Sequence, residues 1–172
     1  MRDHGSQRER LAIEAMYYQD ATGELPKAIQ SYMELIQTYS GDATQHTNVS
    51  SIYGQYEKAL DEAREAIRLG PEASFAYSDL MGDYIALNRL EDAKAAFEQA
   101  RAGKLDSADL RVNRYLLAFL QGDADAMQEQ VAWATGRPGA EGWLLSAQSD
   151  TESYYGRFTK AREFSRRAVV SD

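Results

Sequence analysis

The chain lacks cysteine, has few turn-forming residues and contains no long hydrophobic run, and each of these absences excludes a class of protein. Without cysteine, a disulfide framework, a zinc knuckle, an iron–sulfur cluster or a thiol nucleophile is impossible. Three prolines and 12 glycines in 172 residues are too few for an all-β protein with many hairpins. No stretch approaches the ~20 apolar residues that a membrane helix needs.

Positive charge is also scarce. The chain has 19 Lys and Arg against 27 Asp and Glu, a formal net charge of −8, which argues against nonspecific binding to nucleic acid. The segment Met1–Ser6 has no apolar core after its charges, so we do not expect a signal peptide. With 44% apolar residues, the composition favours a folded, cytoplasmic protein that binds neither nucleic acid nor membrane.

What the chain does contain is an internal repeat. Alanines that open amphipathic stretches are spaced by 31, 34 and 68 residues, and the last spacing is twice the second. A second series of residues lies seven positions after the first. A third series lies five positions before the first and consists of Gly and Asn, which tolerate positive φ. The three series are Ala28, Ala59, Ala93, Ala161; Leu35, Ala66, Ala100, Ala134, Ala168; and Gly23, Gly54, Asn88, Gly122, Gly156. The shared period indicates one repeated structural unit.

Each repeat has the pattern of two helices. Over 73–87 the apolar residues follow the spacing of a buried helical stripe, Asn88 and Arg89 interrupt it, and 91–102 resumes it. Alanines that recur at one position allow two helix backbones to approach closely. The sequence therefore predicts a series of tight helical hairpins.

The best repeat resembles the tetratricopeptide repeat (TPR). Its matching residues are Tyr77 in the place of the usual Trp, Leu80, Tyr84, Ala93, Phe97 and Ala100, while Met81 and Leu105 stand where Gly and Pro are usual. The preceding repeat carries His46, Val49, Ser50, Tyr53, Ala59, Ala66 and Pro71. Stretches such as 22–25, 52–60 and 161–168 are similar to TPR regions attached to bacterial serine/threonine kinases and winged-helix regulators.

The resemblance implies an all-α, right-handed superhelical solenoid of about five helix-turn-helix hairpins, forming one TPR-like domain over 1–172. The expected repeats are about 7–40, 41–71, 72–105, 106–139 and 140–172. Such a domain is a non-catalytic scaffold for protein–protein interaction, so we expect a protein or peptide partner and no cofactor. A regulatory segment of a bacterial kinase or transcriptional regulator is an alternative.

The spacing of 31 shortens the second repeat by three residues, upstream of Gly54. One interpretation is a first helix about one turn shorter. The other is a continuous helix from about Thr44 to Leu69, which would favour a domain-swapped homodimer. In that case Tyr53, Gly54, Gln55 and Tyr56 would take part in self-association.

TPR-like solenoids present first-helix side chains on a concave groove, and the resemblance places the groove positions in this chain. The candidate groove residues are Arg10, Ile13, Tyr17, Thr47, Ser51, Phe75, Ser78, Ile85, Phe119, Trp143 and Asp150, with Val112, Leu116 and Ser146 among the further positions. Their mixture suits a peptide or helix with apolar anchors, of which Tyr17, Phe75, Phe119 and Trp143 are the candidates. The alternative is that several of these side chains pack between repeats.

The C-terminal segment has two features of its own. A basic run of Arg157, Lys160, Arg162, Arg166 and Arg167 suits either an acidic partner or a solvated helix face. No polar capping helix follows, so we expect Phe164, Val169 and Val170 to be partly uncovered. Either the chain is a fragment of a longer protein, or another copy buries that face.

The search for catalytic and metal-binding motifs is negative. G-x-S-x-G, H-E-x-x-H and the P-loop are absent from the sequence. The acidic pair Asp123 and Asp125 opens a helix, so capping explains it better than a metal site. The glycine-rich run 136–142 follows a helix and is interpreted as a loop between repeats. We expect neither an enzyme nor a metal site.

Overall fold

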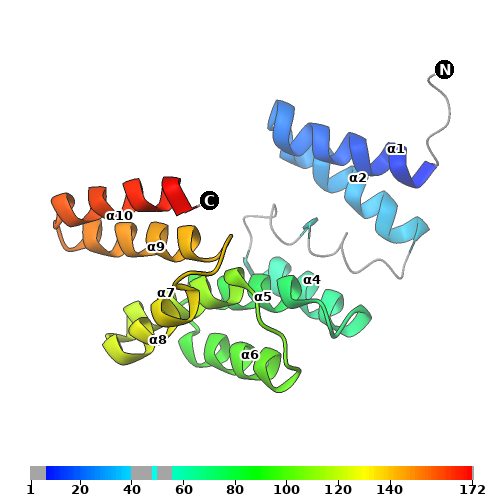
Figure 1. Ribbon diagram of the computed structural model, residues 1–172. Helices are drawn as coiled ribbons and strands as arrows, with labels where there is room; N and C mark the ends of the chain where they lie inside the picture. Colours follow the sequence, from blue (N-terminus) through cyan, green and yellow to red (C-terminus); the bar gives the residue numbers. More distant parts are fainter. Residues whose placement is uncertain (1–6, 40–47, 50–55, 172) are drawn as a thin grey trace. The chain divides into compact units, whose positions relative to one another are not determined.

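The computed structural model describes residues 7–39, 48–49 and 56–171, which form helices and connecting turns with no strand among them (Figure 1). The helices fall into two compact units, residues 1–87 and 88–172, called here the first and the second unit. None of the described helices is long and apolar enough to cross a bilayer.

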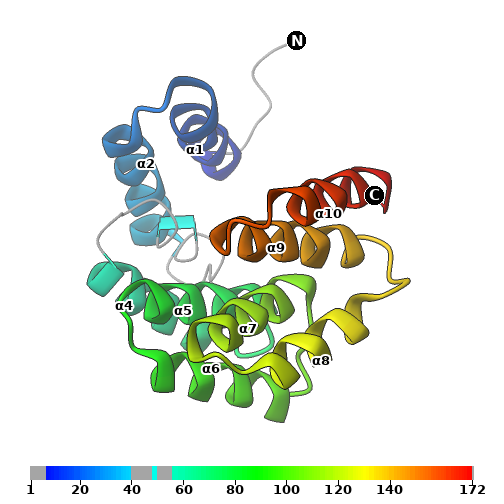
Figure 2. The same cartoon turned by 90° about the vertical axis from the view of Figure 1, so that its left-hand side faces the viewer.

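The first unit begins with a hairpin of α1 (Gln7–Met16) and α2 (Leu25–Thr38), connected by a π-helical segment η1 (Tyr17–Thr22). Gly23 ends this segment at a φ of 69°, a conformation that glycine adopts without strain. The side chains of Ala15, Ala28, Tyr32 and Leu35 are buried together between the two helices. Figure 2 shows the two helices side by side.

The rest of the first unit consists of α4 (Tyr56–Leu69) and α5 (Ser74–Ala86), which pack against each other. The buried face of α4 carries Ala59, Leu60, Ala63 and Ala66, so three of its four buried residues are small. Small residues allow the close helix approach that the repeat pattern predicts.

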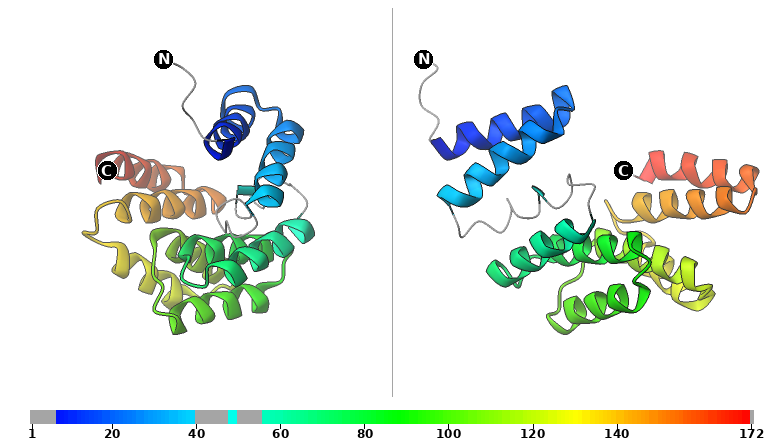
Figure 3. Two further views of the ribbon diagram at one scale, coloured as in Figure 1. Left: turned by 90° about the vertical axis from the view of Figure 1, so that its right-hand side faces the viewer. Right: turned by 180° about the vertical axis from the view of Figure 1, so that it is seen from behind.

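The second unit contains α6 (Leu90–Ala102), α7 (Ala108–Gln121), α8 (Ala124–Ala134), α9 (Glu141–Tyr154) and α10 (Phe158–Ser171). Helix α7 packs against α6, α8 and α9, and α10 packs along α9 (Figure 3). The N-caps of α7 and α8 are side chains: Ser107 accepts from the Leu110 amide and Asp123 from the Ala126 amide. The capping role predicted for Asp123 is therefore confirmed.

The turn and packing positions of the repeat pattern also agree with the structure. Gly23, Asn88, Gly122 and Gly156 have φ values between 55° and 72°, as their turn position requires. All of the alanines that define the first two series are buried. The glycine-rich run begins in the loop that connects α8 with α9. Gly54 and the region of the predicted shortening lie outside the described residues.

Candidate functional site

The main cavity on a predicted groove surface lies between α7 and α9. It has a volume of about 340 Å³ and is lined by Val112, Leu116, Trp143, Ser146, Ala147 and Asp150. Every one of these except Ala147 is a position that the TPR resemblance assigns to the groove. Trp143 is 49% exposed, so its indole is available to a ligand.

A second cavity of about 340 Å³ adjoins the first across α9. Its lining residues are Ser146, Ser149, Asp150, Ser165, Ala168 and Val169, so it lies between α9 and α10. Because Ser146 and Asp150 line both cavities, the two form one hollowed surface that runs from α7 across α9 to α10. We call this surface the α7–α9–α10 groove.

The chemistry of the groove is apolar with hydroxyl groups and one charge. Asp150 is the single ionised side chain among the described residues that line the two cavities. Its carboxylate is exposed and forms no ion pair with a described residue. A ligand with an apolar side chain and a neighbouring cation or N–H donor would match this lining.

Buried contacts fix α9 between its two neighbours. The Tyr115 hydroxyl on α7 lies 2.8 Å from the Thr151 hydroxyl on α9. On the other side, the Ser149 hydroxyl donates to the Ala161 carbonyl at 2.9 Å and lies 2.8 Å from the Ser165 hydroxyl. Leu144 is almost fully buried beside Tyr115. The groove wall is therefore held by both hydrogen bonds and core packing.

On its opposite side, α7 is fixed to α8 by a polar cluster. The buried Arg111 guanidinium pairs with both oxygens of Asp106, at 2.7 and 3.0 Å, and donates to Gln130 at 3.0 Å. The Trp133 indole donates to the same Asp106 carboxylate at 3.0 Å. The hydrogen bond from Arg111 is the main cause that lowers the pKa of the Asp106 carboxyl, and the hydrogen bond from Trp133 lowers it further. The buried Arg111 guanidinium therefore has hydrogen-bond partners within the cluster. A charge in a protein interior is strongly destabilising unless it is paired in this way.

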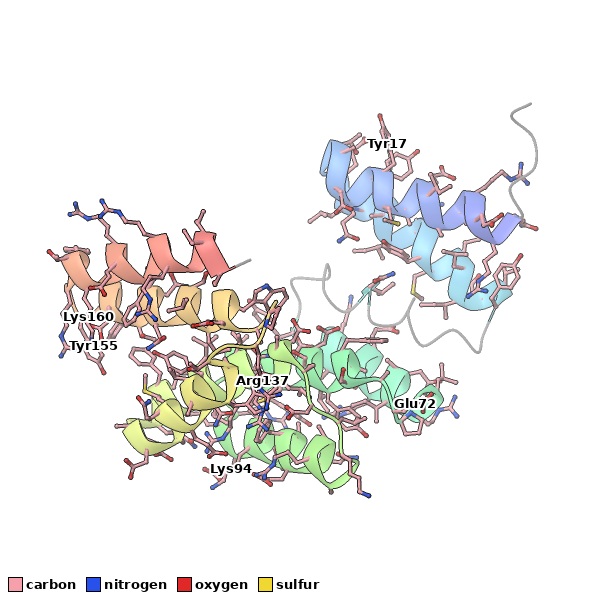
Figure 4. All side chains as sticks on the ribbon, viewed as in Figure 1. Tyr17, Glu72, Lys94, Arg137, Tyr155 and Lys160 are labelled. Carbon is pink, nitrogen blue, oxygen red and sulfur yellow. The ribbon has the colours of Figure 1, made fainter. Side chains whose placement is uncertain are left out.

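Phe119 lies at the end of the groove rather than in its cavities. Its ring contacts Tyr154 and Tyr155 edge-on, with centroid distances of 5.3 and 5.6 Å. The Arg157 guanidinium stacks on Tyr155 at 4.8 Å. Tyr155 and Lys160 are labelled where the α9–α10 hairpin turns (Figure 4). Sequence reasoning placed Phe119 in the groove but did not predict this aromatic cluster.

The first unit presents part of its predicted groove residues on α1 and η1. Arg10, Ile13 and Tyr17 are all exposed, and their spacing of three and four residues places them on one helix face. Figure 4 labels Tyr17. The candidates Thr47 and Ser51 lie outside the described residues.

The groove positions on α5 differ in exposure. Phe75 is 39% exposed, Ile85 is half-buried and Ser78 is buried. On the same helix, burial and the neighbouring charge of Asp79 raise the pKa of the Asp83 carboxyl from 3.8 to about 7. Oδ2 of Asp83 is buried without a hydrogen-bond partner among the described residues. The i, i+4 spacing of the two aspartates was the available sequence signal, and sequence reasoning missed it.

The residues predicted for self-association are placed as follows. Val169 and Val170 are 82% and 85% exposed, and Phe164 is half-buried. Tyr56 opens α4 and is 45% exposed. Tyr53, Gly54 and Gln55 lie outside the described residues. No group of three or more potential metal ligands occurs within the part of the chain that the structure describes.

Comparisons with known proteins identify the fold. No protein-family model matches the chain, and no curated protein is similar to it in sequence. A tetratricopeptide repeat protein from Parabacteroides merdae is 18% identical at a TM-score of 0.74, covering 99% of this chain and 67% of its own. A thermophilic TPR protein of Thermus thermophilus is 18% identical at a TM-score of 0.76, covering 95% of this chain and 91% of its own.

A third structure is described as YrrB, a TPR protein with an unusual peptide-binding site. It is 20% identical at a TM-score of 0.58 and covers 94% of this chain and 84% of its own. The chain therefore has the all-α TPR fold that its sequence predicts. At this level of identity the likeness extends to the fold alone.

Proposed function

We propose that the chain is a non-catalytic interaction module that binds an extended peptide segment of a protein partner in the α7–α9–α10 groove. The observation that supports this proposal most strongly is the cavity between α7 and α9, where Trp143, Val112 and Leu116 surround an open space next to Asp150. A structure of the same fold is described as having a peptide-binding site, which makes this use of the fold reasonable.

The lining defines the chemistry of the segment. An apolar side chain of the ligand fills the space against Trp143 and Leu116, and a lysine or arginine of the ligand lies beside Asp150. The exposed Ser146 hydroxyl, which lines both cavities, faces the peptide backbone, for which it is a suitable hydrogen-bond partner. Exposed aromatic residues in a partly preformed pocket are typical anchors of such interfaces.

Peptide selection followed by calorimetry tests the proposal. A random-sequence peptide library is selected on the intact chain, and the strongest peptide is measured against variants. We expect the selected peptides to combine an apolar residue with a basic one. Trp143→Ala and Asp150→Lys should each weaken binding about tenfold or more, which corresponds to about 1.4 kcal/mol.

The matched control is Leu120→Ala, which removes an apolar side chain that is 52% exposed on α7 but lines neither cavity. This variant should bind like the unaltered chain. Selected peptides whose affinity is insensitive to both Trp143→Ala and Asp150→Lys would contradict the proposed groove.

Self-association through the shortened second repeat is the second candidate function. Tyr56, exposed at the start of α4, is the described residue that favours it. Light scattering across a dilution series measures the mass directly: 19.3 kDa at every concentration rules out the dimer, and twice that value persisting on dilution supports it. A cytoplasmic role as a segment of a bacterial kinase or transcriptional regulator stays a prediction from sequence resemblance.

A further inference from the structure

A third cavity lies on the other edge of the α9–α10 hairpin. It has a volume of about 420 Å³ and is lined by Glu141, Leu145, Arg166, Arg167, Val170 and Ser171. It shares no lining residue with the α7–α9–α10 groove. Leu145 is buried at its base, whereas Val170 is 85% exposed at its rim. We call this surface the basic edge.

The cations of α10 divide into two groups along the helix. At its beginning, Lys160 and the preceding Arg157 both pair with Glu152, at 2.7 and 3.2 Å. Further along, Arg162, Arg166 and Arg167 form no ion pair with any described residue. The two cations at the start of α10 therefore share one carboxylate within the hairpin, whereas the three arginines further along have no ion-pair partner among the described residues.

Glu141, the one carboxylate among the described residues that line the cavity, forms no ion pair with these arginines. Glu141 accepts a hydrogen bond from the Gly136 amide at 3.0 Å, in the loop before α9. Helix α10 itself carries four cationic residues and one acidic residue, although the whole chain has an excess of acidic residues. The basic edge is thus a local reversal of the protein's charge.

We propose that the basic edge binds an acidic amphipathic helix of a partner protein. An apolar side chain of that helix packs on Leu145 and Val170, and carboxylates one turn away pair with Arg166 and Arg167. Arg162 lies one turn before Arg166 on the same face and extends the charged rim. A cleft between two antiparallel helices fits the ridge of side chains of a third helix, and guanidinium groups favour carboxylate partners.

A lipid surface is a weaker match for the same residues. The arginines surround a cleft that accommodates single side chains, whereas a membrane-binding helix presents a broad apolar face. In addition, the net charge of −8 opposes approach to an extended anionic surface.

The probe is a synthetic helical peptide with the heptad Leu-Glu-Ala-Leu-Glu-Ala-Glu repeated, labelled with a fluorophore and titrated with the full chain. We expect saturable binding that weakens as salt is added, because the contacts are charge pairs at a rim. Arg166→Glu combined with Arg167→Glu should weaken binding at least about tenfold, and a peptide with Lys in place of Glu should bind this variant instead.

The control combines Lys94→Glu with Arg101→Glu on α6, which changes the net charge by the same amount at a distant exposed face. This control variant should bind the acidic helical peptide as the unaltered chain does. If the double arginine variant is unfolded by circular dichroism, Arg166→Gln with Arg167→Gln replaces it, with the same expected loss. The peptide selected for the α7–α9–α10 groove should bind both double variants as it binds the unaltered chain. The two proposals can therefore fail independently.

Several results would overturn the proposal. These are the absence of saturable binding, an equal loss in the α6 control, and binding to phosphatidylserine vesicles without binding to the peptide. Dimerisation of the chain alone that Val170→Asp abolishes would also overturn it, because the edge would then be occupied by a second copy.

Discussion

Helices α5 and α9 are both expected to line a groove, yet they offer a ligand different surfaces. On α5, Ser78 is buried, and the carboxyl of Asp83 is withdrawn from solvent far enough to raise its pKa to about 7. On α9, Trp143, Ser146 and Asp150 are exposed and line cavities. The same repeat position therefore does not guarantee the same accessibility, and the proposed recognition is concentrated on the second unit.

The largest effect is expected at a core residue that lies next to a groove residue. Leu144→Ala should lower the free energy of unfolding by about 2–5 kcal/mol, because it leaves a cavity beneath α9. Trp143→Ala changes the neighbouring, half-exposed side chain and should cost about 0.5 kcal/mol or less. Urea denaturation followed by far-UV circular dichroism measures both.

The contrast between core and groove on α9 would be lost if the two variants had equal stability. In that case Trp143 would be a packing residue, and its loss of peptide binding would reflect unfolding rather than lost contact.

An intermediate effect is expected from the carboxyl on α5. The pKa of the Asp83 carboxyl is raised in the folded state, so the folded protein binds this proton more tightly than the unfolded chain does. The resulting stabilisation is lost as the pH rises from about 4 through about 7. Asp83→Asn should therefore raise the free energy of unfolding at pH 8 by about 1–2 kcal/mol, a value reduced for partial exposure.

Denaturation of both proteins across the pH range measures this difference. At pH 4 the two proteins should have similar stability, and the gap should open as the pH rises. A gap that is constant with pH would mean that the Asp83 carboxyl titrates in its ordinary range.

The smallest effect concerns the hydrogen bond that joins α7 to α9. Tyr115→Phe removes the hydroxyl partner of Thr151 and should cost about 1 kcal/mol. Tyr154→Phe is the matched control, since that side chain is 78% exposed, and its stability should not change. Equal melting curves for the two variants would show that the hydrogen bond does not stabilise the groove wall.

Much of the fold was predictable because the repeat constrains it locally. Gly122 and Gly156 mark helix ends that only certain residues tolerate, and the recurring alanines mark the close helix contacts. The groove positions on α7 and α9 came from the TPR resemblance, which assigns Val112, Leu116, Trp143, Ser146 and Asp150 to the groove, and these five residues line the cavity between the two helices.

What sequence reasoning missed depends on contacts between distant side chains. Arg111 bonds to Asp106 and Gln130, and Trp133 bonds to the same Asp106 from 27 positions away, and no motif marks these hydrogen bonds. The division of the α10 cations into paired and unpaired groups depends on Glu152, which belongs to the preceding helix. Periodicity assigns a residue to a face but does not indicate its partner.

The most direct test of the account is a crossed binding measurement on one set of proteins. The selected groove peptide and the acidic helical peptide are each titrated against Asp150→Lys and against Arg166→Glu with Arg167→Glu. We expect the first variant to weaken only binding of the groove peptide and the second to weaken only binding of the acidic helix. Equal weakening of both ligands by either variant would mean that the groove and the basic edge are not two separate recognition surfaces.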